Sequence, residues 1–473
     1  MSANQRFTRF IFILIDGAPY DVFKELLEDG MLPNIKKHVI DRGSFKKAVS
    51  VFPSTSGPAY IPFFMGLFPG RANIPGIRWL SKKDFKHPYH IYNPGIRSYT
   101  GLDSNLFSRD LPSQSTWYDY FPSVSNIYHP LTRGCPPSGN RTRLIKIITQ
   151  PYAHFTHRWN LIDTMISRML LQDVKKKKHS VMSLFPAVDG NAHASHRKSA
   201  AVLKSYRLVD QTVGKMAKIL QQQGDYDKTL ILISSDHGIS DTHTHVDVAA
   251  HLDKWGLRCL HYPRLFRRKV KSASMISGNG MSNLYFKNKV NQWGKRLPFE
   301  ELAQQGVVQR LLELEGVDLI AGESQDGSII VQKKGGQGKI SQQNGKISYQ
   351  FKQTDPLGYD TTYHNLSMRE ALIKTYHSAY PDGLVQLWQL FQGERTGDLV
   401  LSAKAGYDLR VRYEYPKHHA THGALIAEQM LVPLAISHPL KSEYIRTVDL
   451  FPTVLSHLGH SIGESQIDGI ALL

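Results

Sequence analysis

Cysteine is scarce in this sequence: only Cys135 and Cys259 occur in 473 residues. Two cysteines that form no C-x-x-C motif cannot supply a disulfide framework, so a fold held together by disulfides is excluded. A reducing compartment fits this composition. We therefore expect the protein to be cytoplasmic.

Long hydrophobic runs are also missing. The apolar stretch from Phe10 to Ile15 is too short for a signal peptide or a membrane span, and no small-residue cleavage site follows it. No later run is long enough to cross a bilayer. We expect neither a signal peptide nor a transmembrane segment, and we interpret the first stretch as a buried strand.

Acidic residues are too few to balance the basic ones: 40 Asp and Glu face 58 Lys and Arg, which gives a formal net charge of +18. This sign favours anionic partners, although a basic surface without a specific ligand is the alternative. The basic clusters are Lys175 to Lys178 and Arg264, Arg267, Arg268, Lys269 and Lys271. No nucleic-acid module accompanies them. We predict a small phosphorylated substrate, with peripheral contact to an anionic membrane left open and the oligomeric state undetermined.

Strand and helix signals alternate through much of the chain, which is the order expected of a mainly parallel sheet with helices on both faces. The predicted strands are Phe10–Ile15, Lys47–Phe52, Val181–Val188, Thr229–Ser235 and Met430–Ile436. The predicted helices cover 20–28, 33–43, a short stretch from 57, 202–220 and 447–458. The fold class is therefore α/β.

Two segments interrupt this alternation. Residues 77–152 are rich in Tyr, Pro, Ser and Asn and show little periodicity, as in an inserted lid. Residues 246–404 contain hairpin-like pieces at 335–353 and helical pieces at 368–376 and 384–391. We predict a catalytic core of residues 1–245 and 405–473, with an inserted α+β cap of residues 246–404.

Acidic and histidine side chains follow several of the predicted strands. The candidate metal ligands are Asp16, Asp189, His193, Asp236, His237 and His422. In a parallel sheet such residues meet at the carboxyl edge, where three carboxylates would repel each other unless cations held them. Six Asp and His ligands are too many for one tetrahedral ion and enough for two, most suitably zinc, with manganese or iron as alternatives. Taken singly, each Asp could instead form a turn or cap a helix.

Ser56 is the candidate nucleophile and an additional metal ligand. It lies between a predicted strand and a helix, where free N–H groups of the first helical turn would bind an anion. A metal ion bound to its hydroxyl would lower the hydroxyl pKa and let it attack as an alkoxide. In the alternatives, Ser56 only caps the helix or Thr55 is the nucleophile.

These segments resemble the alkaline phosphatase superfamily, and most of all its nucleotide pyrophosphatase/phosphodiesterase branch. The similarity lies in the order of Asp16, the segment Pro53 to Pro58, Asp189 with His193, Ser235 to Gly238, and His422-Gly423, and extends to Arg446–Thr453 and Asp468-Gly469. It implies one metal at Asp189, His193 and His422. It implies a second at Asp16, Asp236 and His237, with Ser56 beside it. The implied activity is hydrolysis of phosphodiesters or nucleotide pyrophosphates through a phospho-serine intermediate; a monoesterase, a phosphonate hydrolase and a non-catalytic binding protein are the alternatives.

Two positions depart from the related patterns. Ala59 stands where the phosphodiesterases commonly have an Asn that holds a phosphoryl oxygen, so we predict that Asn73 or Arg78 supplies this contact. Tyr60 replaces the Arg of the sulfatase segment and no Cys is present there, which argues against formylglycine chemistry.

Other polar and aromatic residues allow two interpretations each. His243, His245 and Asp247 could orient the metal ligands, and His418 and His419 could line the cleft; for all five, a place on the exposed surface is the favoured alternative. The aromatic residues of the first insertion could stack on a base or sugar, or form a small core of their own. They are Trp79, Tyr89, Tyr92, Trp117, Tyr118 and Tyr120.

Overall fold

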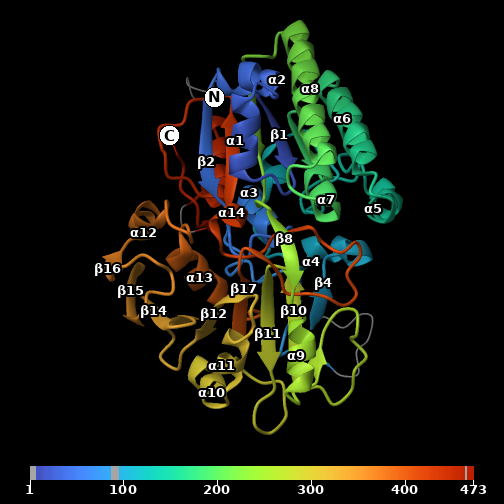
Figure 1. Cartoon of the computed structure of the whole chain (residues 1–473). Coiled ribbons are helices and arrows are strands. Elements are labelled where there is room, and N and C mark those ends of the chain that lie inside the picture. Colours follow the sequence, from blue (N-terminus) through green and yellow to red (C-terminus); the bar gives the residue numbers. More distant parts are fainter. Residues whose placement is uncertain (1–6, 87–94, 464–465, 473) are drawn as a thin grey trace.

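The computed structural model describes residues 7–86, 95–463 and 466–472 (Figure 1). Its main sheet has six strands in the order β2-β20-β7-β1-β6-β5. The strands are β1 (Arg9–Ile15), β2 (Ser44–Val49), β5 (Val124–Ile127), β6 (Ser180–Phe185), β7 (Thr229–Ser234) and β20 (Leu431–Ile436). Strands β5, β6, β1 and β7 are parallel, whereas β20 and β2 are antiparallel to their neighbours. The predicted α/β class with a mainly parallel sheet is confirmed.

The side chains of β1 are buried on both faces of this sheet. Phe10, Phe12 and Leu14 pack into one hydrophobic cluster, and Ile11 and Ile13 pack into another on the opposite face. Alternate side chains of a strand point to opposite faces, so a continuous apolar run is what a strand covered on both sides requires.

Helices cover each face of the main sheet. One face is packed by α1 (Tyr20–Glu28), α6 (Trp159–Lys175) and α8 (Ala200–Gln223), and the other by α3 (Ile61–Met65) and α15 (Leu450–His457). Short pieces complete this part: α2 (Pro33–Ile35), the π-helical turn η1 (Lys36–Ile40), the 3-10 turns η2 (Pro58–Tyr60) and η5 (Thr447–Asp449), and α14 (Ala427–Met430).

A second sheet has nine strands in the order β16-β15-β14-β13-β12-β17-β11-β10-β9. Its strands are β9 (Cys259–Leu260), β10 (Ser272–Ser277), β11 (Met281–Phe286), β12 (Val317–Glu323), β13 (Ile329–Lys333), β14 (Gly336–Gln343), β15 (Lys346–Gln353), β16 (Tyr363–Leu366) and β17 (Leu399–Ala403). Its helices are α9 (Val248–Lys254), α10 (Phe299–Gln304), α11 (Val307–Leu312), α12 (Met368–Thr375) and α13 (Gly383–Phe391). All its strands lie within the segment for which we propose a cap.

Helix α13 joins the two sheets. Its apolar residues share a hydrophobic cluster with Val49, Val51 and Phe52, which lead into the Ser56 segment. The Gln386 side chain accepts a hydrogen bond from Phe52 N (2.9 Å), and Gln389 Nε2 donates one to Phe52 O (2.8 Å). The backbone before Ser56 is therefore held by the second sheet's own helix.

Smaller elements lie around the junction. They are β3 (Arg78–Leu80), β4 (Ile96–Ser98), η3 (Gly101–Leu106), α4 (Phe107–Asp110), η4 (Trp117–Tyr120), α5 (Ile145–Thr156), α7 (Ala187–Ala194), β8 (Ser240–His245), β18 (Gly406–Asp408) and β19 (Ala420–Thr421). Strand β8 pairs with β18 and β19 in a small sheet of its own.

Several predicted boundaries differ from the structure. Strand β5 lies inside the expected insertion 77–152 but pairs with β6 in the main sheet. The strand predicted over Val181–Val188 ends at Phe185, because Pro186 is the N-cap of helix α7, which begins at Ala187. Strand β2 starts and ends three residues before the predicted Lys47–Phe52. No helix in the described part of the chain is long and apolar enough to cross a membrane.

Candidate active site

Three candidate ligands from two strand ends surround the Ser56 hydroxyl. Asp16 follows β1, and Asp236 and His237 follow β7. Ser56 Oγ lies 3.2 Å from Asp16 Oδ1, 3.3 Å from Asp236 Oδ2 and 3.2 Å from His237 Nε2. One hydroxyl proton cannot satisfy three acceptors at once. The arrangement therefore suits a cation held between these atoms.

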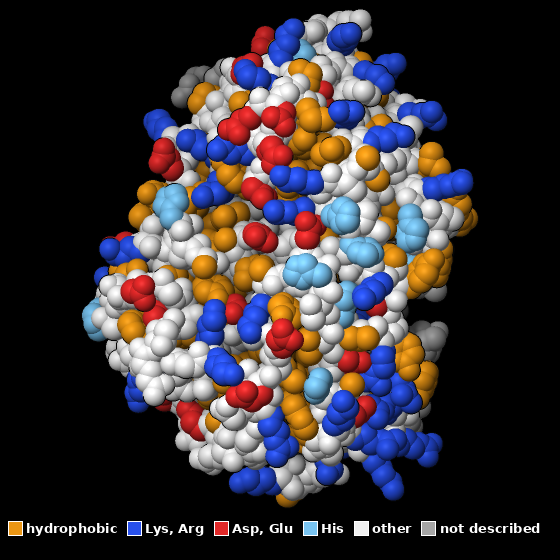
Figure 2. All heavy atoms as spheres, viewed as in Figure 1, with side chains coloured by type: hydrophobic (Ala, Val, Ile, Leu, Met, Phe, Trp, Pro, Cys, Tyr) orange, Lys and Arg blue, Asp and Glu red, His pale blue; other side chains and the backbone are white. Residues whose placement is uncertain are grey.

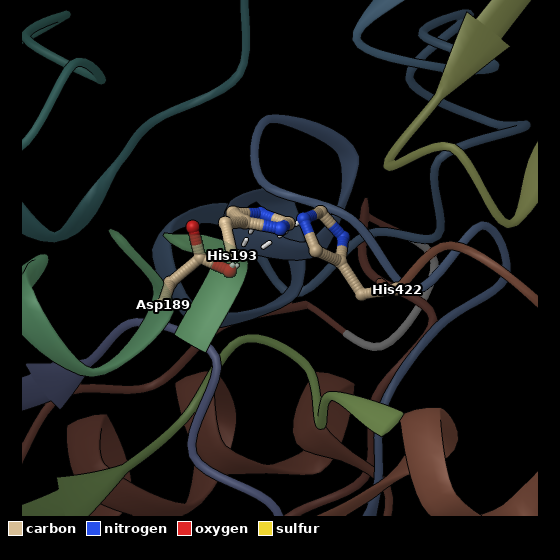
Figure 3. A group of neighbouring side chains, drawn as sticks. All are labelled: Asp189, His193 and His422. Carbon is tan, nitrogen blue, oxygen red and sulfur yellow. Dashed lines mark ion pairs between the residues drawn. The ribbon is translucent and has the colours of Figure 1, made fainter. Parts of the chain in front are cut away.

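A second group lies beside the first. Asp189 and His193 stand one turn apart on α7, and His422 follows β19 (Figure 3). The Nε2 atoms of His193 and His422 lie 3.2 Å and 3.6 Å from Asp189 Oδ1. In each of the two groups, candidate ligand atoms lie within 4.8 Å of one another. The rings of His237 and His422 stack at 3.8 Å, which joins the groups.

All three histidines turn the same nitrogen toward the site. Their Nδ1 atoms contact backbone carbonyls: His193 that of Ala420 (2.7 Å), His237 that of Gly238 (3.0 Å) and His422 that of Ser54 (3.2 Å). A carbonyl accepts a hydrogen bond from Nδ1–H, so the proton stays on Nδ1 and Nε2 keeps a free electron pair directed at the carboxylates.

Because the three carboxylates are shielded from water and close together, ionising all of them costs free energy unless cations balance their charge. Burial, together with the charges of Asp236 and Asp189, raises the pKa of Asp16 well above its usual range. Burial also raises the pKa of Asp236. Burial opposes ionisation of Asp189 as well, but the nearby histidines, His193 foremost, lower its pKa. Asp189 Oδ1 is buried without a hydrogen-bond donor, which fits a metal ligand.

The hydrogen bonds of three neighbouring hydroxyls, those of Ser54, Thr55 and Ser56, distinguish the candidate nucleophiles. Ser54 Oγ donates to Ala424 O at 2.7 Å, and Thr55 Oγ1 is buried without a hydrogen-bond partner. Only Ser56 Oγ contacts candidate ligands by a hydrogen bond among these three. The geometry favours Ser56 over Thr55.

The anion site that we expected at the start of the helix after Ser56 offers fewer free backbone N–H groups than predicted. After Ser56 the chain forms the turn η2 and then a five-residue helix, α3. Ala59 N and Tyr60 N already donate to the carbonyls of Thr55 and Gly57, and Pro58 has no N–H. The free N–H groups that we expected in this turn are thus largely used. Tyr60 OH instead donates to Asp16 Oδ2 at 3.4 Å.

A cavity of about 480 Å³ opens on both groups, and three of its lining residues are cationic: Arg78, Lys146 and Arg410. Arg78 donates to Ser98 Oγ (3.2 Å) and Ile276 O (3.1 Å). Asn73 does not line this cavity; its Oδ1 accepts from Arg395 N at 2.9 Å. Of the two predicted substrate contacts, the structure brings only Arg78 to the cavity.

His418 lies closer to the site than the surface interpretation allowed. It lines the cavity, and its ring stacks on His193 at 3.9 Å. Glu414 holds His418 Nδ1 (3.3 Å) and His245 Nδ1 (3.2 Å). His245 thus belongs to a separate group with Glu414 and Asp408.

The remaining candidates are structural. Asp247 caps α9 and pairs with Arg412, whereas His243 and His419 are exposed. Trp79, Trp117 and Tyr118 are buried in the core and Tyr120 packs against it; Tyr89 and Tyr92 lie outside the described residues. Sequence reasoning missed Lys146 and Arg410, because neither belongs to a motif; Lys146 lies on α5 and Arg410 in a loop after β18.

The profile of the type I phosphodiesterase / nucleotide pyrophosphatase family matches residues 10–425, a range that includes every candidate ligand. The chain belongs to this family. It is therefore a hydrolase, as the resemblance of the motifs implied. A comparison with curated proteins gave no match.

Solved structures share the fold at low sequence identity. Phosphonoacetate hydrolase from Sinorhizobium meliloti 1021, in complex with phosphonoacetate, is 13% identical, with a TM-score of 0.58 and 96% of each chain covered. Inactive murine ectonucleotide pyrophosphatase/phosphodiesterase 5 in complex with AMP is 13% identical, with a TM-score of 0.56 and 96% of each chain covered. The human protein is 12% identical, with a TM-score of 0.58 and coverage of 98% of this chain and 97% of that one. The fold is thus that of the alkaline phosphatase superfamily.

Proposed function

We propose that the protein hydrolyses phosphodiester or nucleotide pyrophosphate bonds with two divalent metal ions and a phospho-serine intermediate on Ser56. One observation carries this proposal: Ser56 Oγ lies within 3.3 Å of three candidate ligands, Asp16, Asp236 and His237, which its single hydroxyl proton cannot satisfy together. Such an arrangement suits cations rather than hydrogen bonds.

The donor atoms divide into two sets. Asp189, His193 and His422 would hold one ion; Asp16, Asp236 and His237, together with Ser56, would hold the other. Nitrogen and carboxylate ligands suit zinc, with manganese or iron as alternatives. When bound, the ions supply positive charge that favours the Ser56 alkoxide and balances charge on the phosphate oxygens.

Ser56 carries the covalent step. The Ser56 hydroxyl loses its proton to solvent, and Oγ forms a bond to phosphorus while the bond from phosphorus to the leaving oxygen breaks. Water then attacks phosphorus, the Oγ–P bond breaks, and a proton from that water restores the Ser56 hydroxyl. The backbone bonds to Gln386 and Gln389 fix the Phe52 backbone and so position the Ser56 loop at the cavity floor.

Substrate contacts come from the cavity wall. We propose that Arg78 replaces the amide expected at the position of Ala59, because it lines the same cavity as Ser56. A phosphonate or phosphate monoester is the second candidate substrate. The three cations at the wall favour it, because such a substrate carries more negative charge than a diester.

Replacing Ser56 with Ala tests the nucleophile. Turnover of bis-p-nitrophenyl phosphate should fall by about 10³-fold or more, since the covalent route is lost. Two metal ions per chain should remain by elemental analysis. The matched variant Thr55→Ala should keep most activity; the reverse pattern would assign the reaction to Thr55.

Comparing substrates tests the reaction class. Metal-loaded protein should hydrolyse bis-p-nitrophenyl phosphate faster than p-nitrophenyl phosphate or phosphonoacetate. A preference for either of the latter by orders of magnitude would replace the diesterase by the second candidate. We also propose a cytoplasmic location, which the free state of both cysteines supports and cell fractionation tests.

A further inference from the structure

Helix α5 exposes apolar side chains that nothing in the described part of the chain covers. Leu144 is 73% exposed, Ile148 74% and Phe155 64%, and Ile147 and Tyr152 exceed 40%. Leu144, Ile148, Tyr152 and Phe155 follow each other at intervals of four, four and three residues, so they share one face of the helix. Isolated exposed apolar residues are ordinary, but a continuous stripe marks an interaction surface.

Neighbouring segments extend this stripe. The ring of Tyr415, which is 55% exposed, lies 5.7 Å from that of Phe155. Leu161, just after the helix, is also 55% exposed. We call these side chains, with the α5 stripe, the α5 patch. It lies at the outer edge of the molecule, where hydrophobic side chains gather in the space-filling view (Figure 1, Figure 2).

The surroundings of the α5 patch carry charge of one sign. No Asp or Glu occurs from Arg141 to Ile162. Arg143, Lys204 and Lys417 are exposed and have no carboxylate partner among the described residues. Lys204 and Leu161 line one shallow groove. In Figure 2 further Lys and Arg side chains gather lower on the same side, over the loop between β9 and β10.

The α5 patch also borders the catalytic cavity. Gln150, His154 and Phe155 belong to α5 and line that cavity. Leu144 and Ile148 do not line it. A surface that covered the patch would therefore lie against the mouth of the cavity.

We propose that the α5 patch docks the protein on an anionic phospholipid bilayer, with the cavity mouth facing the lipid headgroups. Apolar side chains of an interfacial helix enter the boundary between headgroups and acyl chains, and flanking cations meet anionic headgroups. A second copy of this chain fits poorly, since a two-fold contact through the patch would bring like charges together. Docking is separate from catalysis and can be tested without it.

Vesicle binding tests the proposal. Metal-loaded protein should cosediment with vesicles of phosphatidylcholine and phosphatidylglycerol, and weakly with phosphatidylcholine alone. The double variant Leu144→Ser/Ile148→Ser should bind at least about tenfold less, because it removes two apolar side chains from the lipid contact. Turnover of soluble bis-p-nitrophenyl phosphate should not change.

A matched control is Val290→Ser/Ile373→Ser, which removes two exposed apolar side chains, 69% and 40% exposed, from elsewhere on the surface. It should bind vesicles like the natural sequence. Equal binding by the Leu144/Ile148 variant, or no binding of the natural sequence to anionic vesicles at low salt, overturns the proposal. So does light scattering that shows a dimer which this variant dissociates, since the patch would then join two copies.

Discussion

At each of three histidines, a backbone carbonyl selects the nitrogen that faces the site. The carbonyls of Ala420 and Ser54 come from parts of the chain far from His193 and His422. Their contacts remove the choice of tautomer, so the donor atoms are oriented before any ion binds. The fold thus orients the donor atoms of the proposed metal centre and places three carboxylates close together.

Replacing Asp236 with Ala should remove one of the two metal ions per chain. Asp236 is fully buried and lies against Ser56 and His237, so its loss leaves only two strong ligands in that group. Elemental analysis after gel filtration measures the change. Asp241→Ala, at an exposed carboxylate nearby in sequence, is the control. Retention of both ions in Asp236→Ala would break the assignment.

Lys146 should give substrate affinity a dependence on pH. Burial lowers the pKa of Lys146 to about 8, although the charge of Asp16 acts to raise it. The side chain is therefore cationic below this pH and neutral above it, and anion binding should weaken as the pH rises from about 7 to 9. KM should rise over this range.

The variant Lys146→Met should have a higher KM at pH 7 and lack that part of the rise. Parallel pH profiles for KM in the variant and the natural sequence would show that Lys146 does not contact the substrate. Comparing a monoester with a diester sharpens the test, because the more highly charged monoester should respond more strongly.

Sequence reasoning found the residues of short motifs and missed those without one. Asp16, Asp236 and His237 could be predicted because each directly follows an apolar strand. Lys146 comes from a segment with little periodicity, and Asn73 is turned away by its bond to Arg395 N. Which side chains reach the cavity wall depends on packing between segments that no local pattern records.

Among the elements, local chemistry predicted the interior of strands better than their ends. The strand β1 and the helix α1 agree with their predictions. The strand predicted to run to Val188 ends earlier, because α7 begins at Ala187 directly after Pro186. Strand β5 was missed because its sequence, Val-Ser-Asn-Ile, contains two polar residues that are nevertheless buried. The hairpin β14–β15 was expected, and Asn344 and Gly345 both have the positive φ that its tight turn requires.

A buried ion pair ties α13 to the final helix of the core. Arg446 Nε and Nη2 donate to the two carboxylate oxygens of Asp382 at 2.7 Å, and Asp382 is fully buried. Replacing Asp382 with Ala leaves the buried guanidinium without its paired carboxylate, so the free energy of unfolding should fall by about 3–5 kcal/mol.

Urea denaturation of metal-loaded protein measures this loss. Asp41→Ala breaks an exposed ion pair with Lys36 and should cost no more than about 1 kcal/mol. Equal effects of the two variants would mean that the Arg446–Asp382 pair does not hold the elements together.

On the scale of the whole molecule, metal binding should stabilise the folded chain. The carboxylates of Asp16, Asp189 and Asp236 meet only when the segments that follow β1, β6 and β7 are in place, so the unfolded chain cannot bind the ions as tightly. At about 1,000 times the dissociation constant, binding contributes about 4 kcal/mol. Removing the ions with a chelator should therefore lower Tm by on the order of 5 °C.

Differential scanning fluorimetry with and without chelator, followed by zinc, checks this expectation. Ser56→Ala should keep the response because most ligands remain. The Asp16→Ala/Asp189→Ala variant should lose it, since each group then lacks a carboxylate. A Tm that does not respond in the natural sequence would contradict metal binding to the folded state.

The position of α13 limits which segment of this chain could be exchanged for that of a relative. The segment that includes the second sheet also supplies Gln386 and Gln389, which hold the backbone at Phe52. Exchanging residues 246–404 for the corresponding part of a relative, in order to transfer specificity, would therefore change the support of the catalytic loop as well. A chimera that retains α13 and the ion pair between Asp382 and Arg446 would change substrate recognition without changing the support of the catalytic loop.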